Sequence, residues 1–227
     1  MCDSPSRTPS PAPLASLIQS SCFNLSIIQH NCANSNPILI SLFSSFNHNT
    51  PPVIVAIQEP FLYKDQPPSV PSYTLIAPPK PTDGKVLSCF YILTSFLNST
   101  SLVPLFFDRG DICGLSISYP DNGFRRLLKS VTIYNIYNKH LGRFNRSVPP
   151  QLCFQKSALP TLVLGDFNIH HQAADPLRNF KRSELTLSSS YFDTALERNY
   201  ALLNTPGSTI SRERLFCPSF RGGASVG

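Results

Sequence analysis

The stretch Thr161-Leu162-Val163-Leu164-Gly165-Asp166-Phe167-Asn168-Ile169-His170-His171 joins a short apolar run to a glycine, a carboxylate and an amide. An apolar run of this length, entered from Pro160, predicts a buried strand rather than a helix. Residues i and i+2 of an extended chain point to the same side, so Asp166 and Asn168 should face one point just past the strand end. Open α/β sheets build their sites at that position. Taken alone, the pair is also typical of a simple turn after a strand.

The composition indicates a globular domain without a secretion or membrane signal. The 227 residues are 41% hydrophobic and leave room for one sizeable domain. The formal net charge of +6 suits a polyanionic partner such as nucleic acid, although many proteins without such a partner are equally basic. The seven cysteines form no C-x-x-C pair, which favours reduced thiols inside a cell over a zinc ribbon or a disulfide scaffold. No apolar run approaches the roughly 18 residues of a membrane helix, so we expect no membrane partner.

Three regions differ in composition. Residues 1–21 are rich in serine and proline and lack apolar periodicity, which predicts a flexible leader. Residues 22–210 carry the predicted helices and strands and form the domain. Residues 211–227 show no clear strand and end near a Gly-Gly-Ala-Ser run, so we expect a divergent, disordered tail.

The order of the elements predicts an α/β fold. A strand at 23–28, a helix opening at Asn36-Pro37 with Asn36 as its N-cap, and a buried strand at 53–57 form a βαβ start. The stretch from 61 to 120 predicts an antiparallel meander, with strands at 73–77, 87–93, 102–107 and 112–119. A strand at 128–136 and helices at 147–158 and 190–198 complete the pattern. The inward helix faces are expected to be Ile38, Leu39, Leu42, Phe43 and Phe46, and later Phe192, Ala195 and Leu196.

Polar side chains follow four of the predicted strands. They are Asn31, Glu59, Tyr137 with Asn138, and Asp166 with Asn168. Acids and amides are hard oxygen donors, which suit Mg²⁺ or Mn²⁺ better than zinc. Glu59 could hold the ion and Asp166 could orient or deprotonate a water, while amides and a phenol donate to phosphate oxygens. The set therefore predicts metal-assisted hydrolysis of a phosphodiester.

Four motifs in this order resemble the endonuclease/exonuclease/phosphatase family. They are Gln29-His30-Asn31, Gln58-Glu59-Pro60, Asn135-Ile136-Tyr137 and Gly165-Asp166-Phe167-Asn168. In this sequence the last motif continues to His170-His171, and Leu-Leu-Asn-Thr-Pro-Gly-Ser-Thr occurs near the end. This form of the pattern is most similar to the endonuclease domain of fungal non-LTR retrotransposons. The resemblance covers roughly residues 23 to 210.

The resemblance implies a four-layer α/β sandwich, with two mixed β-sheets face to face and helices outside. Because the end of the chain departs from the family pattern, we expect the last strands of this sandwich to be missing. It implies a monomeric, Mg²⁺-dependent enzyme that nicks double-stranded DNA in the nucleus, alongside a reverse transcriptase module. The roles carried over are Glu59 as metal ligand, Asn31 as a site-positioning group, Tyr137 and Asn168 on the phosphate, and Asp166 on the attacking water. Substrate contacts are assigned to Asn138, His140 and His171.

The end of the chain departs from the family pattern. Relatives close their site with a Ser-Asp-His motif, and no Asp-His pair occurs in this sequence. We therefore expect a C-terminally truncated copy with weak or no activity. Two alternatives stay open: a phosphatase of the same fold that acts on phosphoinositides or other small esters, and a catalytically dead, DNA-binding remnant.

Overall fold

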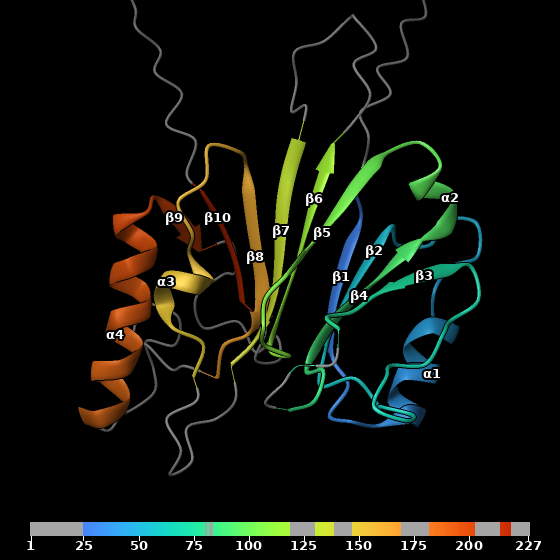
Figure 1. The fold of residues 1–227 in the computed structure, drawn as a ribbon, viewed down its shortest axis with the longest axis horizontal. Helices are drawn as coiled ribbons and strands as arrows, with labels where there is room; N and C mark the ends of the chain where they lie inside the picture. The colour runs from blue at the N-terminus through green and yellow to red at the C-terminus, as the bar shows by residue number, and fades with distance from the viewer. Residues whose placement is uncertain are drawn as a thin grey trace, which may run out of the picture.

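Two β-sheets face each other, and helices cover their outer sides (Figure 1). The computed structural model describes residues 25–79, 81, 84–118, 130–138, 147–168, 182–202 and 214–218. Its strands are β1 (Ile27–Asn31), β2 (Ile54–Gln58), β3 (Tyr73–Ile76), β4 (Ser88–Leu93), β5 (Ser101–Phe106), β6 (Ile112–Ser118), β7 (Ser130–Tyr137), β8 (Thr161–Asp166), β9 (Tyr200–Leu202) and β10 (Arg214–Pro218). Its helices are α1 (Asn36–Ser44), α2 (Thr94–Leu97), α3 (Pro150–Cys153) and α4 (Arg182–Glu197). Within these ranges, no helix is both long and apolar enough to cross a membrane.

The layers form the expected four-layer α/β sandwich. The four-stranded sheet has the order β1-β2-β4-β3, and the six-stranded sheet has the order β5-β6-β7-β8-β10-β9. Figure 1 shows α3 and α4 outside the six-stranded sheet and α1 outside the four-stranded sheet. Both sheets are mixed, since β1–β2 and β7–β8 are parallel while their other neighbours are antiparallel.

The alternation of side chains along β2 shows how the layers are held together. Ile54 and Ala56 pack into the core between the sheets, while Val55 and Ile57 pack into the core under α1. Side chains alternate between the two faces of a strand, and both faces of β2 are covered. The unbroken apolar run in the sequence is therefore the expected pattern. A third core fills the space between the six-stranded sheet and the helices α3 and α4.

The predicted meander is divided between the two sheets. β3 pairs with β4 in one sheet, and β5 pairs with β6 in the other. α2 lies between β4 and β5, where the chain crosses from one sheet to the other. Antiparallel pairing of sequential strands was thus correct, but a single continuous meander was wrong, because β4 takes β2 as its second neighbour.

The predicted helices differ from the structure at their ends. The N-cap of α1 is Ser35, whose side chain accepts from the Ile38 amide, and not Asn36 as predicted. The helix predicted at 147–158 is only the short α3, and past it the Ser157 hydroxyl accepts from the Leu159 amide in a local turn that competes with helix. The helix predicted at 190–198 starts earlier, at Arg182.

Two helix positions predicted to face inward are exposed. Ile38 is 39% exposed and Leu196 is 68% exposed. Both lie at the margin of a helix face whose centre, marked by Leu39 and Ala195, is 2% exposed. The periodicity of apolar residues identifies the centre of the buried face of a helix. The width of that buried face depends on how closely the neighbouring sheet packs against the helix.

The tail prediction was wrong for one segment, because Arg214–Pro218 forms β10. β10 pairs antiparallel with both β8 and β9, so it lies inside the six-stranded sheet. A short isolated apolar segment has weak strand preference by itself, and its neighbours supply the backbone partners. The leader at 1–21 and the rest of the tail lie outside the described residues.

Gly165 of β8 is required by its close approach to β7. It pairs with Ile136 in the parallel register and has φ of 154°. A Cβ placed on it would lie 2.0 Å from the Ile136 carbonyl oxygen, far inside contact distance. The glycine of the Gly-Asp-Phe-Asn motif therefore lets the end of β8 pack against β7.

We expect Gly165→Ala to lower the free energy of unfolding by about 1–3 kcal/mol, the usual result of forcing atoms into a filled space. Gly84→Ala is the matched control, since nothing lies within 4 Å of a Cβ at that position. Urea unfolding of both variants tests this. Equal midpoints for the two variants would contradict the assignment.

Candidate active site

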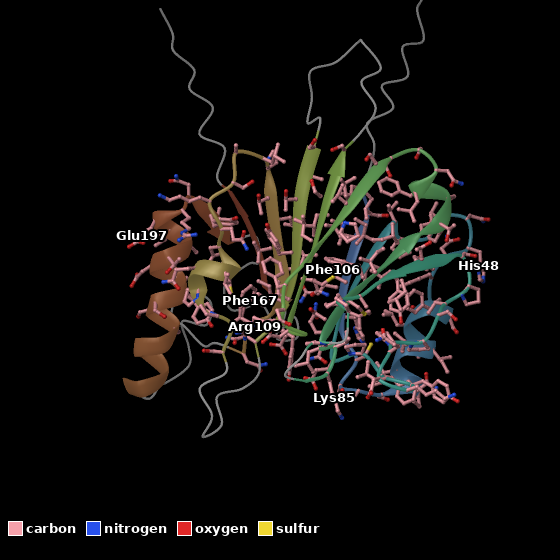
Figure 2. The ribbon with its side chains drawn as sticks, viewed as in Figure 1. His48, Lys85, Phe106, Arg109, Phe167 and Glu197 are labelled. Atoms are coloured by element: carbon pink, nitrogen blue, oxygen red, sulfur yellow. The ribbon has the colours of Figure 1, made fainter. Side chains whose placement is uncertain are left out.

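The candidate site lies at the edge where the carboxyl ends of four strands meet. β1 and β2 run parallel in one sheet, and β7 and β8 run parallel in the other. Their carboxyl ends lie at the lower edge in Figure 1. In Figure 2 the labelled Phe167, which follows β8, and Arg109 lie in this lower region. The strand ends predicted from the sequence are thus brought together by the facing sheets.

The side-chain amide of Asn31 joins the two carboxylates of the site. Its Nδ2 donates to Glu59 Oε1 at 3.2 Å and to Asp166 Oδ2 at 3.1 Å. Asn31 ends β1 and Glu59 follows β2, both strands of the four-stranded sheet, while Asp166 ends β8 of the six-stranded sheet. One neutral donor therefore holds two acids from facing sheets close to a common point.

Tyr137 faces the same carboxylates with a neutral hydroxyl. Burial raises the pKa of this phenol, and so do its hydrogen bond to Glu59 and the negative charges of Glu59 and Asp166. A phenol held in its neutral form remains a hydrogen-bond donor at physiological pH. Tyr137 is therefore suited to donate to a carboxylate or to a phosphate oxygen.

Asp166 and Asn168 are not placed as an extended chain would place them. The strand ends at Asp166, and Asn168 has φ of 46°, in the left-handed region. The Asn168 backbone amide donates to Asp166 Oδ1 at 3.1 Å, and its side-chain Nδ2 donates to the Asn138 carbonyl at 2.7 Å. The pair is thus a turn that fixes the Asp166 carboxylate, so the turn and site interpretations hold together.

Asn138 points into the interior instead of toward a substrate. Its Nδ2 donates to the Phe167 carbonyl at 2.8 Å and to the Tyr191 hydroxyl at 3.1 Å. Its Oδ1 accepts from the Val148 amide at 3.0 Å. These bonds tie the ends of β7 and β8 to α4, so we assign Asn138 a supporting position. The other two predicted substrate contacts, His140 and His171, lie outside the described residues.

Several residues at the site were given no role from the sequence, although three of them, Gln29, Gln58 and Asn135, lie in the quoted motifs. Gln29 accepts from the Gly165 amide at 3.1 Å, and Asn34 donates from Nδ2 to Glu59 Oε2 at 2.9 Å. Gln58 donates to Asn135, which donates in turn to the carbonyls of Ile57 and Cys89 at 2.9 and 2.8 Å. Polar residues in otherwise apolar strands are the signal for Gln29, Gln58 and Asn135, whereas Asn34 lies in a turn without any pattern.

The donors of the site fit a magnesium or manganese ion. No group of three or more His, Cys, Asp or Glu side chains suited to a metal occurs among the residues described above. Mg²⁺ commonly takes one or two carboxylates and completes its shell with water and substrate phosphate oxygens. Glu59 and Asp166, held together by a neutral amide, offer such a set.

Comparisons with known proteins identify the fold. No family model and no curated protein sequence matches the chain. Among solved structures, it is similar to the endonuclease domain of TRAS1, a telomere-specific non-LTR retrotransposon, with a TM-score of 0.52, 13% identity and coverage of 85% of this chain and 84% of that one. It is also similar to a Bacteroides thetaiotaomicron mannosyl-6-phosphatase, with a TM-score of 0.51, 15% identity and coverage of 86% of both chains. The chain has the endonuclease/exonuclease/phosphatase fold, as its four motifs predicted.

We expect Tyr137→Phe to lower the free energy of unfolding by about 1.5–3 kcal/mol at neutral pH, the usual contribution of a hydrogen bond to a charged group. A phenol pKa raised above its ordinary 10.0 contributes stability that is complete below pH 10 and is lost as pH rises through the folded value. The difference between wild type and Tyr137→Phe should therefore shrink above pH 10.

Urea unfolding at neutral pH and above pH 10 measures this difference. Tyr63→Phe is the control, because Tyr63 is 64% exposed. A constant difference at all pH values would contradict the assignment.

Proposed function

We propose that the chain hydrolyses phosphodiester bonds with the help of Mg²⁺ or Mn²⁺ and that its substrate is double-stranded DNA, which it nicks. The observation that carries this proposal is the Asn31 amide shared between Glu59 and Asp166 at 3.2 and 3.1 Å. Two carboxylates held close together in this way favour a bound cation. The oxygens of a phosphate ester commonly complete the coordination shell of Mg²⁺, so a phosphate ester suits this site as substrate.

Each residue has a distinct part in the proposed reaction. Glu59 would hold the metal ion, and a divalent ion bound there would supply positive charge that stabilises the phosphate as the bond to the leaving oxygen breaks. Asp166 orients and deprotonates the attacking water, since its carboxylate is kept in place by Asn31 and by the Asn168 amide. Tyr137 donates its neutral hydroxyl to a phosphate oxygen. Asn168 supports this arrangement through its backbone amide, which donates to Asp166 Oδ1, while its side-chain Nδ2 donates to the Asn138 carbonyl.

DNA is favoured over a small ester by charge and by one structural neighbour. The net charge of +6 attracts a polyanion. The similar TRAS1 domain is described as a retrotransposon endonuclease. As the endonuclease of a retrotransposon, the chain would act in the nucleus as a monomer, together with a reverse transcriptase module.

A second candidate is hydrolysis of small phosphate monoesters. It is supported by the similarity to a mannosyl-6-phosphatase, whose TM-score of 0.51 nearly equals that of the retrotransposon domain. Release of inorganic phosphate from a sugar phosphate, with no nicking of DNA, would favour this candidate.

We expect Glu59→Gln and Asp166→Asn each to reduce nicking of a supercoiled plasmid by about 10²- to 10⁴-fold with Mg²⁺ present, because each removes a charged group from the reacting centre. Glu197→Gln is the matched control, since Glu197 is exposed on α4 and lies well away from the site edge (Figure 2). Undiminished nicking by either site variant would contradict the placement of that residue at the reacting centre. Wild-type chain that neither nicks DNA nor releases phosphate would support the inactive remnant.

A further inference from the structure

Asn34 lies in a tight turn that leads from β1 into α1. The Ser35 amide donates to the Cys32 carbonyl at 2.8 Å, and the two central residues, Ala33 and Asn34, have φ of 48° and 58°. Two successive left-handed residues define a type I′ turn, which favours glycine and asparagine. An alanine in this conformation is uncommon and strained.

The turn is fixed to the end of β2 by backbone hydrogen bonds. The Cys32 amide donates to the Gln58 carbonyl, and the Asn34 amide donates to the Glu59 carbonyl, both at 2.8 Å. The Ala33 amide donates to Asn31 Oδ1, also at 2.8 Å. Glu59 itself has φ of 45°. Residues with a left-handed backbone thus lie at both ends of the hydrogen bond from the Asn34 amide to the Glu59 carbonyl. Such conformations are common where the surrounding structure holds a functional group in place.

The side chain of Asn34 completes the contacts of the Glu59 carboxylate. Its Nδ2 donates to Glu59 Oε2 at 2.9 Å, while Asn31 Nδ2 donates to Oε1 at 3.2 Å. Each carboxylate oxygen therefore receives one neutral amide donor. Two donors on opposite oxygens fix the rotation of the carboxylate about its terminal bond.

We propose that Asn34 is a positioning residue that orients Glu59 for a divalent cation, an inference that rests on the proposed function. Groups that hydrogen-bond to a metal ligand set its orientation, and their removal typically weakens metal binding about 10- to 100-fold. Asn34 is the residue type that combines a left-handed backbone with a neutral donor. An aspartate would tolerate the backbone but repel Glu59, and a glycine would keep the backbone without the donor.

The simpler alternative is that Asn34 only serves the turn. Asn34→Gly separates the two roles, because glycine adopts φ of 58° freely and loses only the side chain. Asn34 is exposed, so its removal leaves no buried cavity. Asn199 is the matched control: it is also exposed, has φ of 59° and lies after α4, away from the site.

The experiment measures Mn²⁺ binding to the full chain by titration calorimetry, together with melting temperature. We expect Asn34→Gly to raise the dissociation constant of Mn²⁺ about 10- to 100-fold. Asn199→Gly should leave that constant unchanged. The melting temperatures of both variants report whether the chain stays folded.

Three outcomes would overturn the inference. Equal Mn²⁺ binding by wild type and Asn34→Gly overturns the positioning role alone. An equal loss of binding in Asn34→Gly and Asn199→Gly assigns the effect to the backbone. A wild-type chain that neither binds Mn²⁺ nor hydrolyses phosphate esters refutes the proposed function itself, and the inference with it.

Discussion

The hydrogen bonds from Asn31 to Glu59 and Asp166 join the two sheets at the edge that carries the site. Most of the contact between the facing sheets is apolar packing, which sets their separation but does not fix individual groups. A buried polar contact from Gln58 of β2 to Asn135 of β7 adds to it. At this edge β1 meets β8 through polar contacts: Asn31 reaches the Asp166 carboxylate, and Gln29, two residues earlier on the same face, accepts from the Gly165 amide. These paired bonds fix how the two sheets are aligned, so the carboxylates meet at one point.

A chain of backbone hydrogen bonds extends this alignment across the edge. Glu59 donates its amide to the Leu87 carbonyl at 2.9 Å, and the Leu87 amide donates to the Gly110 carbonyl at 2.7 Å. The neighbouring Asp111 carbonyl accepts from the Tyr137 amide at 2.9 Å. Loop residues at this edge therefore have internal partners, which keeps the strand ends rigid. A rigid edge keeps the Glu59 and Asp166 carboxylates at fixed positions around the Asn31 amide.

Much of the fold could be predicted because its strongest signals are local. The apolar run of β2, the Asn-Pro start near α1 and the Gly-Asp-Phe-Asn ending of β8 each follow from a few neighbouring residues. Predictions failed where distant partners decide the outcome. β10 forms because β8 and β9 supply its hydrogen-bond partners. The chain passes from one sheet to the other between β4 and β5 because β4 pairs with β2 and not with β5.

The candidate site shows the same division. Spacing after strands predicted Asn31, Glu59, Tyr137 and Asp166 as site residues, and the structure brings these four side chains together. It did not distinguish Asn138, whose amide is used inside the protein, from residues that face the site. Side-chain direction past a strand end depends on backbone conformation, which turns left-handed at Asn168.

The sequence by itself determined the strand cores, the four polar strand ends and the family whose fold they share, because these rest on residue type and short-range order. Only the tertiary structure decided that Asn34 would reach Glu59 and that Asn31 would bridge Glu59 and Asp166, the second of which lies 135 positions further along the chain than Asn31. Contacts of this kind arise when separate sheets pack together, and the hydrogen-bond geometry they create is set by that packing. The sequence therefore specifies which chemical groups are available to the site, and the packing of the two sheets specifies how those groups are arranged.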